Sequence, residues 1–254
     1  DVRGVYIPIE IKPGTLGPAL ESLPKLGFKG VNLTMPLKQE AIATVDELDP
    51  VGKLMGAVSC IVVRRDNSLL GVNNDWIGFR DNLNATFPGW KSTTQSALVL
   101  GAGGGGLAIV YALVQEGLKQ IFITNRSQER AEQIADIFKD EHIIVRPWSD
   151  RHSLVAESEL IVNTTNQGMA GQTPLDLSLE LAKLDAIVAD IIYVPLETAL
   201  ICDAKSRGLR TVGGLGMLLH QSRPAWQLWF GIDPHITSHL RSAMERDINL
   251  DSQS

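Results

Sequence analysis

Cysteine is scarce in this chain, with two in 254 residues, Cys60 and Cys202. They lie far apart in the sequence, form no Cys-x-x-Cys pair, and have no histidine nearby at the spacing of a metal-binding set. This pattern argues against a structural disulfide and a zinc site, and no metal is predicted. Isolated cysteines are typical of a reducing compartment, so we expect a cytoplasmic protein.

Basic residues are not in excess either. Lysine and arginine number 23 against 29 aspartates and glutamates, which gives a net charge of −6, and no basic stripe stands out. Nucleic acid and an anionic membrane are therefore poor candidate partners. With 44% hydrophobic and 20% charged residues, the composition is that of a globular protein, long enough for one large domain or two modest ones.

One long uncharged run needs an explanation, SALVLGAGGGGLAIVYALV at residues 96–114. Five of the six residues between 101 and 106 are glycines, and each glycine costs a continuous helix roughly 1 kcal/mol relative to alanine. A strand, a glycine turn and a helix account for these residues better than a membrane span does. No membrane-spanning segment is therefore predicted.

Two regions of the chain differ in rhythm. From Ser96 onward, short β-branched runs alternate with longer helical patterns, which is typical of a parallel sheet covered by helices on both faces. The first third is mixed, and the last forty or so residues are helical again. Residues 88–95, PGWKSTTQ, are the best linker candidate. In the first third we expect strands at 5–11, at 30–34 and on both sides of an Asp66-Asn67 turn within 60–73, and helices at 15–26, 36–48 and 75–86.

The glycine turn has the spacing G-x-G-x-x-G at Gly101, Gly103 and Gly106. The spacing alone is weak, but here it follows the strand pattern ALVL and opens the helical pattern LAIVYAL. In that context, bare backbone lets a pyrophosphate approach the free N–H groups of a helix N-terminus. The turn thus predicts dinucleotide binding; the alternative is a merely tight strand-to-helix connection.

The next strand pattern, QIFIT, ends in Asn125, Arg126 and Ser127. A cofactor with a free ribose 2′-hydroxyl usually meets an aspartate or glutamate at this place, whereas an arginine and a hydroxyl suit a 2′-phosphate. Ser127 could instead simply cap the following helix, but capping would not explain the arginine. NADP is therefore predicted in preference to NAD.

Lys38 is an oddity in the segment VNLTMPLKQE at 31–40. Pro36 suits the first position of a helix, which places Lys38 about two residues in, at the positive end of the helix dipole, where a cation is mildly unfavourable. One interpretation is a solvated surface lysine. The other is a catalytic lysine whose ammonium form is destabilised by its position, so that it can exchange a proton as an acid–base group must.

Seven segments, in this order and spacing, resemble the shikimate dehydrogenase family: VNLTMPLK, GVNNDWIGF, GAGGGG, TNRS, VNTTNQGM, DIIYVPLETAL and GLGMLLHQ. The match runs from about residue 5 to residue 231. The resemblance implies an α/β fold of two domains, an α/β substrate-binding domain at 1–78 and 217–254 and a doubly wound, Rossmann-type NADP-binding domain at 79–216. It also implies reversible hydride transfer between NADP and the C3 hydroxyl of shikimate, giving 3-dehydroshikimate, in aromatic amino-acid biosynthesis.

The resemblance further assigns residues to the site. Lys38 matches the catalytic lysine and Asp75 its carboxylate partner, which agrees with the chemistry, since oxidising a secondary alcohol needs a base to take the hydroxyl proton. The implied substrate-contacting residues are Asn32, Thr34, Ser59, Tyr193 and Gln221, and the implied cofactor-binding residues are Gly101, Gly103, Gly104, Gly106, Asn125, Arg126, Ser127, Asn163, Thr164, Met169, Gly214 and Met217.

Several positions depart from the family pattern. The family's Ser-x-Ser near the N-terminus is absent, and because the chain begins without methionine, we expect further residues upstream. Asn-Thr after an alanine is replaced by Ser59-Cys60, and Asn-Thr-Asp becomes Asn73-Asn74-Asp75. Three further positions differ: Asn166 replaces a serine, Leu107 replaces a basic residue, and Gly213 replaces an aspartate.

These departures leave the exact substrate open. The first hypothesis is a shikimate dehydrogenase, monomeric or homodimeric, or a close paralogue acting on quinate, aminoshikimate or another cyclic hydroxy acid. The second is a non-catalytic ligand sensor on the same fold, which the retention of Lys38 and Asp75 disfavours. A third is another two-domain Rossmann enzyme, such as a methylenetetrahydrofolate dehydrogenase, which the motifs NLTMPLK and GLGMLLHQ disfavour.

Overall fold

The computed structural model describes residues 2–251. The chain divides into two compact units, the first formed by residues 1–74 and 222–235 and the second by residues 75–221 and 236–254. Helix α9 (Gly214–Phe230) contributes to both units. The predicted functional division, at 78/79 and 216/217, differs from these compact units by a few residues and by helix α10 (Ser238–Asp251), which belongs to the second unit. That functional division stays a prediction.

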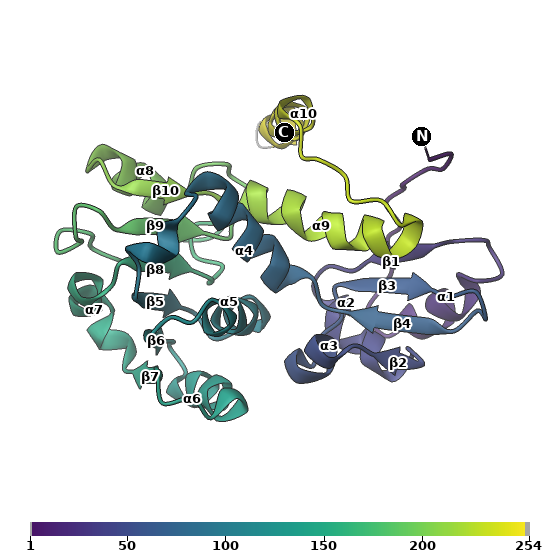
Figure 1. Cartoon of the computed structure of the whole chain (residues 1–254), viewed down its shortest axis with the longest axis horizontal. Helices are drawn as coiled ribbons and strands as arrows, with labels where there is room; N and C mark the ends of the chain where they lie inside the picture. Colours follow the sequence, from purple (N-terminus) through teal and green to yellow (C-terminus); the bar gives the residue numbers. More distant parts are fainter. Residues whose placement is uncertain (1, 252–254) are drawn as a thin grey trace. The chain divides into compact units, whose positions relative to one another are not determined.

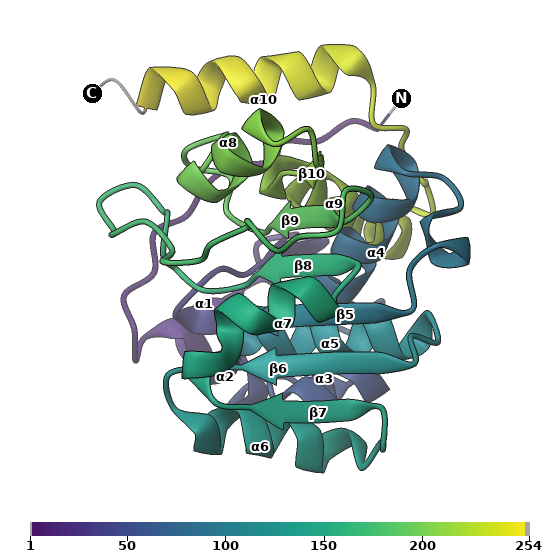
Figure 2. The ribbon, with the colours of Figure 1, turned by 90° about the vertical axis from the view of Figure 1, so that its left-hand side faces the viewer.

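The second unit is built on a six-stranded sheet in which every pairing is parallel (Figure 2). The strand order is β10-β9-β8-β5-β6-β7. The chain starts at β5 in the middle of the sheet, adds β6 and β7 on one side, and then crosses back to add β8, β9 and β10 on the other side, as in a Rossmann fold. The predicted α/β class and doubly wound sheet are confirmed. The strands are β5 (Ser96–Leu100), β6 (Gln120–Thr124), β7 (Ile143–Arg146), β8 (Leu160–Asn163), β9 (Ile187–Asp190) and β10 (Arg210–Val212).

Helices cover both faces of this sheet (Figure 1). One face carries α4 (Asp75–Thr86), α5 (Gly104–Gln115) and α6 (Gln128–Phe138), and the other carries α7 (Arg151–Glu157) and α8 (Ala199–Ser206). Buried strand residues such as Leu98 and Phe122 pack against Leu154 of α7 and Leu200 of α8. The central strands are therefore apolar on both faces, which explains their uninterrupted hydrophobic runs.

The first unit has a smaller, mixed sheet with the order β1-β3-β4-β2. The strands β3 and β4 form the predicted antiparallel hairpin, in which Asn67 adopts a left-handed φ of 68° and Asp66 Oδ1 accepts from the N–H of Ser68 at 3.1 Å. These contacts are those of a turn stabilised by an aspartate side chain. The strands are β1 (Gly30–Asn32), β2 (Glu47–Leu48), β3 (Cys60–Val63) and β4 (Leu69–Val72).

Strand β3 sends alternate side chains to two different clusters, as its period of two requires. Ile61 packs with Leu16 and Leu20 of α1 (Leu16–Ser22), whereas Cys60 packs with Ala225 of α9. Trp229 of α9 also donates from Nε1 to the carbonyl oxygen of Ile61 at 2.9 Å. Residues 222–235 therefore belong to the first unit because this part of α9 packs on one apolar face of the small sheet.

The predicted helix at 36–48 is wrong in most of its length. Helix α2 (Leu37–Glu40) ends after one turn, a 3-10 turn η1 (Ala41–Ala43) follows, and β2 begins at Glu47. Thr44 and Val45 are β-branched and weaken helix continuation at this point. A further helix, α3 (Pro50–Met55), was missed, although Asp49 is its N-cap and accepts from the N–H of Gly52 at 2.7 Å.

The predicted strand at 5–11 and the predicted linker at 88–95 are also wrong. Residues 5–11 form no strand, and Val5 and Tyr6 are 88% and 69% exposed. Pro8 cannot donate to a ladder, which disfavours pairing of this segment. Residues 88–95 lie inside the second unit, where Trp90 of the 3-10 turn η2 (Trp90–Ser92) is buried and donates from Nε1 to Asn84 at 2.8 Å.

Among residues 2–251, no helix combines the length and the apolar character needed to cross a membrane. In the same range, no three histidine, cysteine, aspartate or glutamate side chains gather as a metal ion would require.

Candidate active site

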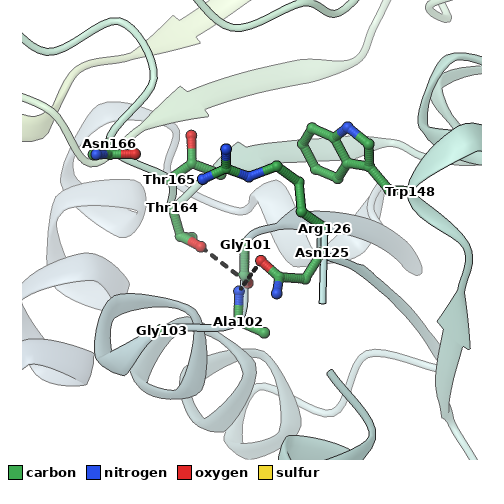
Figure 3. A pocket seen from close by; sticks show the side chains of 9 residues that line it. All are labelled: Gly101, Ala102, Gly103, Asn125, Arg126, Trp148, Thr164, Thr165 and Asn166. Carbon is green, nitrogen blue, oxygen red and sulfur yellow. Dashed lines mark hydrogen bonds between the residues drawn. The ribbon is translucent and has the colours of Figure 1, made fainter. Parts of the chain in front are cut away.

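A cavity of about 170 Å³ lies at the carboxyl ends of the parallel strands in the second unit (Figure 3). Segments that follow β5, β6 and β8, together with the 3-10 turn η3 (Trp148–Asp150) after β7, form its wall. The cavity includes the point between β5 and β8 where the strand order reverses, the usual ligand site of an open α/β sheet. It is lined by Gly101, Ala102, Gly103, Asn125, Arg126, Trp148, Thr164, Thr165 and Asn166.

The glycine turn needs its glycines for two different reasons. Gly101 has a φ of +110°, a left-handed conformation that side chains rarely adopt. Gly106 lies so close to the turn that a Cβ atom would come 2.4 Å from the carbonyl oxygen of Gly101. By contrast, a Cβ atom on Gly103 or Gly104 would meet no atom within 4 Å. The outer side of the turn is thus open backbone, as an approaching pyrophosphate requires.

Asn125 holds the end of β6 against the glycine turn. Its Oδ1 accepts from the N–H of Ala102 at 3.2 Å (Figure 3). Its Nδ2 donates to the carbonyl oxygen of Ser127 at 2.9 Å. Ser127 occupies the N-cap position of α6, but its side chain makes no capping hydrogen bond. The capping explanation for Ser127 is therefore incomplete, and its hydroxyl remains a candidate ligand for a phosphate.

Arg126 and Trp148 line the same cavity (Figure 3). Arg126 is exposed and makes no ion pair with any residue between 2 and 251. Trp148 is held in place by Arg151, whose guanidinium carbon lies 4.9 Å from the indole centroid and whose Nη1 donates to the Trp148 carbonyl oxygen at 3.0 Å. Arg126, a cation that shares the cavity with the fixed aromatic surface of Trp148, suits a phosphate bonded to a nucleoside.

Sequence reasoning missed Trp148. The signal was present, since HIIVRPW ends a third strand pattern with an aromatic residue, at the edge where the other predicted cofactor residues gather. Residues at the carboxyl ends of parallel strands meet in space, so the residue that ends the third strand pattern belongs with those that end the first two.

Asn163 shapes the cavity without lining it. It is fully buried at the end of β8, where its Oδ1 accepts from the N–H of Thr165 at 3.0 Å. Its Nδ2 donates to the carbonyl oxygen of Gln167 at 3.1 Å and to Asp190 Oδ2 at 3.1 Å. Asn163 thus fixes the loop that presents Thr164 and Thr165 to the cavity.

Asp190 anchors this network from β9 with 2% of its surface exposed. It accepts from the N–H of Ile192 at 3.0 Å and from the hydroxyl of Thr198 at 2.7 Å, as well as from Asn163. Burial is the largest influence and raises the pKa of Asp190, while the hydrogen bonds oppose that rise. Asp190 is therefore a structural carboxyl, turned toward the loops and away from solvent.

The remaining predicted residues of the second unit do not line this cavity. Met169 and Tyr193 are surface residues, with 46% and 39% of their area exposed. Gly214 opens α9, where a Cβ atom would come 2.3 Å from the Ile191 carbonyl oxygen. Met217 and Gln221 follow on the same helix, and Asp75 is a buried residue at the start of α4.

In the first unit, backbone hydrogen bonds gather the predicted substrate residues at one end of the small sheet. The N–H of Val58 donates to the Lys38 carbonyl oxygen at 2.8 Å, which places Lys38 beside the start of β3. The N–H of Leu33 donates to the Ser59 carbonyl oxygen at 2.9 Å and brings the segment from Asn32 to Thr34 to the same place. Pro36 is the N-cap of α2 rather than its first residue, and Lys38 is the second residue of that single-turn helix.

Asn74 joins this group, although it was not predicted as a site residue. Its backbone N–H donates to Ser59 Oγ at 2.8 Å, and 5% of the residue is exposed. Its Nδ2 is buried and has no hydrogen-bond partner among residues 2–251. The preceding Asn73 is different, because its Nδ2 donates to the Ala57 carbonyl oxygen at 3.0 Å.

Two protein-family descriptions match this chain. "Shikimate dehydrogenase substrate binding domain" matches residues 1–61, and "Shikimate / quinate 5-dehydrogenase" matches residues 84–175. The first range contains Lys38 and Ser59, and the second contains the glycine turn and Arg126. Lys38, Ser59, the glycine turn and Arg126 thus lie in segments typical of one family, whereas Asp75 lies between the two matched ranges.

Individual relatives agree. The chain is 42% identical over 246 residues to a protein of Rhodospirillum rubrum named shikimate dehydrogenase (NADP(+)), covering 96% of this chain and 87% of that one. The structure of shikimate 5-dehydrogenase from Thermus thermophilus in complex with NADP(H) and shikimate is similar, with a TM-score of 0.79, 33% identity, and coverage of 94% of this chain and 85% of that one. Quinate dehydrogenase from Corynebacterium glutamicum in complex with NAD gives a TM-score of 0.82 at 29% identity, with coverage of 94% and 84%. The identity, the coverage and the shared fold together show that this chain belongs to the shikimate dehydrogenase family.

Proposed function

We propose that this protein is an NADP-dependent shikimate dehydrogenase, which interconverts shikimate and 3-dehydroshikimate by reversible hydride transfer in aromatic amino-acid biosynthesis. The observation that carries the proposal is the cavity beside the glycine turn, lined by the exposed cation Arg126, in a chain that keeps the family's lysine and aspartate at 38 and 75. A relative named shikimate dehydrogenase (NADP(+)) at 42% identity supports it.

The residues of the second unit support a place for the cofactor. The open backbone at Gly103 and the N-terminus of α5 suit the pyrophosphate, whose negative charge the N–H groups stabilise. Arg126, with the Ser127 hydroxyl nearby in the chain, suits the 2′-phosphate, and Trp148 offers its indole face to the adenine. When bound, the nicotinamide ring accepts or returns the hydride.

Proton transfer is the proposed role of Lys38, in the first unit. Oxidation of a secondary alcohol needs a base at the hydroxyl, and reduction of the ketone needs an acid at the same oxygen. Lys38 is the residue proposed for both steps, with Asp75 as the carboxylate that orients it. An ammonium group can give up its proton and take it back, whereas an arginine keeps its proton throughout.

A second candidate is a paralogue acting on quinate or another cyclic hydroxy acid. It is favoured by the replacement of the family's Asn-Thr with Ser59-Cys60, and by similarity to the quinate dehydrogenase structure from Corynebacterium glutamicum, which contains NAD. A serine offers one hydroxyl where an asparagine offers an amide with two kinds of polar atom, so the contacts with ring substituents must differ.

The experiment is an activity screen of the purified protein with shikimate, quinate and aminoshikimate, each with NADP and with NAD, following the absorbance of the reduced nicotinamide. The expected result is the highest kcat/KM for shikimate with NADP. A higher value for quinate or aminoshikimate would establish the paralogue instead, and no turnover of any ring acid would support the non-catalytic sensor. A cytoplasmic location and a monomeric or dimeric state remain predictions.

A further inference from the structure

The starting observation is the buried amide of Asn74. Nearly all buried polar atoms in folded proteins have a hydrogen-bond partner, so one without a partner needs an explanation. Asn74 Nδ2 is buried and finds no acceptor among residues 2–251, although the residue is only 5% exposed. An amide kept in this state is unfavourable for folding unless another molecule satisfies it.

The surroundings of Asn74 are those of the proposed substrate site. Its N–H is bonded to Ser59 Oγ at 2.8 Å, and Ser59 follows Val58, which is bonded to the Lys38 carbonyl oxygen at 2.8 Å. The next residue in the chain is Asp75, the proposed partner of Lys38. Asn74 is thus tied through short backbone links to the residues proposed for proton transfer.

The sequence shows an exchange between these two bonded positions. At position 59 the family pattern has asparagine and this chain has serine, while at position 74 the family pattern has threonine and this chain has asparagine. A carboxamide and a small hydroxyl residue have therefore changed places across the hydrogen bond that joins Ser59 to Asn74. Each change alone alters the set of polar groups, but the pair of changes conserves it.

We propose that Asn74, rather than Ser59, supplies the carboxamide that binds a hydroxyl group of the ring-acid substrate in this protein. The buried Nδ2 donates to a substrate hydroxyl oxygen, and Ser59 holds the Asn74 backbone in position through its Oγ. This inference rests on the proposed function, since it deepens the description of the same substrate site. It accounts for both departures from the family pattern with one contact.

A different explanation is that Asn74 is a helix cap, because it directly precedes α4. A cap works through its side-chain oxygen, and threonine also serves as a cap. Capping would therefore make Asn74→Thr nearly neutral for both stability and activity. It would also leave the exchange at Ser59 unexplained.

The experiment is a double-mutant cycle of Asn74→Thr and Ser59→Asn, with kcat/KM for shikimate and the Tm measured for all four proteins. Asn74→Thr alone removes the amide, and we expect kcat/KM to fall by about 10- to 100-fold, chiefly through KM. Ser59→Asn alone places two amides side by side and should lower kcat/KM by a similar factor. The double variant returns the amide to position 59 and should recover to within about threefold of the wild-type value.

Asn74→Leu separates substrate binding from a structural task. It removes the unsatisfied amide at similar volume, so the Tm should stay the same or rise while kcat/KM falls by about 10- to 100-fold. Asn84→Leu is the matched control, because Asn84 accepts from Trp90 Nε1 at 2.8 Å, and it should lower the Tm and leave kcat/KM unchanged.

Independent effects of the two substitutions, or wild-type kcat/KM in Asn74→Thr, would overturn the inference while the proposed function stands. A fall of the Tm in Asn74→Leu with unchanged KM would overturn it in favour of a structural amide. Absence of turnover in the wild-type protein would instead overturn the proposed function, and the inference with it.

Discussion

The buried polar groups behind the cofactor cavity and those at the proposed substrate end are handled differently. In the second unit, Asn163 and Asp190 lie behind the cofactor cavity, and they bind each other and the adjacent loops through hydrogen bonds of 3.1 Å or less. In the first unit, Asn74 is buried to a similar degree, but its Nδ2 finds no partner among residues 2–251. A satisfied buried amide holds a loop in place, whereas an unsatisfied one is available to a ligand.

The difference also concerns what recognises the ligand. The cofactor cavity depends on backbone, since the glycine turn and the strand ends create it and a few side chains refine it. The substrate end depends on side chains at the tips of short strands, where single substitutions change the available donors and acceptors. Departures from the family pattern occur in both regions. Ser59, Cys60 and Asn74 lie at the substrate end and Asn166 lines the cofactor cavity, whereas the glycine spacing and Arg126 are retained.

The largest expected effect tests the catalytic role of the first unit. Lys38→Ala should lower kcat by at least ~10²-fold, the usual scale for removing a general acid–base group, while the affinity for NADP stays nearly unchanged. Lys38→Arg should not restore turnover, because arginine keeps its proton. Steady-state kinetics together with a titration of NADP binding measure both quantities.

Lys53 on α3 provides the control for this substitution. It is an exposed lysine of the same unit, and Lys53→Ala should leave kcat and the NADP affinity at wild-type values. Wild-type turnover in Lys38→Ala would make Lys38 an ordinary surface lysine, and would remove proton transfer from the tasks of the first unit.

A somewhat smaller effect tests the charge in the cofactor cavity. Arg126→Ala should raise KM for NADP by about 10- to 100-fold, corresponding to about 1.5–3 kcal/mol for a hydrogen bond to a charged group, and should leave NAD use nearly unchanged. Arg130→Ala, an exposed arginine on α6 outside the cavity, should change neither. Equal losses for both cofactors would show that Arg126 acts on the fold rather than on the 2′-phosphate.

Trp148 sharpens the same comparison, because an aromatic surface does not distinguish the two cofactors. Trp148→Ala should weaken NADP and NAD binding alike, by about 1–2 kcal/mol, and Trp148→Phe should retain most of the affinity. Isothermal titration calorimetry with 2′,5′-ADP and with ADP gives the dissociation constants for the wild type and both variants. A loss confined to NADP would place Trp148 at the 2′-phosphate instead of the adenine.

The sequence predicted the second unit better than the first, for a physical reason. Long apolar runs, a glycine turn and regular alternation are dictated by burial on both faces of a parallel sheet, so pattern and structure coincide from Ser96 onward. In the first unit, elements such as β2 and α3 have two and six residues, too short for a period to emerge. In such short elements, caps and tertiary contacts decide where the element begins and ends, as Asp49 does as the N-cap of α3.

The candidate site shows the same limit. Arg126 and the glycines could be recognised because local spacing defines them, whereas Trp148 and Asn74 acquire meaning from neighbours distant in the chain. Asn74 meets Ser59 across 15 positions, and Trp148 lines one cavity with Arg126 across 22. Neither arrangement can be derived from propensity or periodicity, and the unsatisfied state of the Asn74 amide is a property of the folded structure alone.

The smallest expected effect tests whether the buried network of the second unit is structural, through the pH dependence of stability. Burial raises the pKa of Asp190 above its ordinary value of 3.8, so the folded protein holds a proton that the unfolded chain releases. The stability from this protonated carboxyl is present below about pH 4 and is lost as the pH rises through the raised pKa. Asp190→Asn cannot titrate, and its amide can still bond to Asn163 and Thr198. Urea unfolding of both proteins between about pH 4 and pH 8 should therefore show the wild type losing stability relative to the variant, by less than about 1.4 kcal/mol per pH unit. A wild type that gains stability relative to Asp190→Asn over this range would mean that the three donors outweigh burial, and that Asp190 is held as a carboxylate.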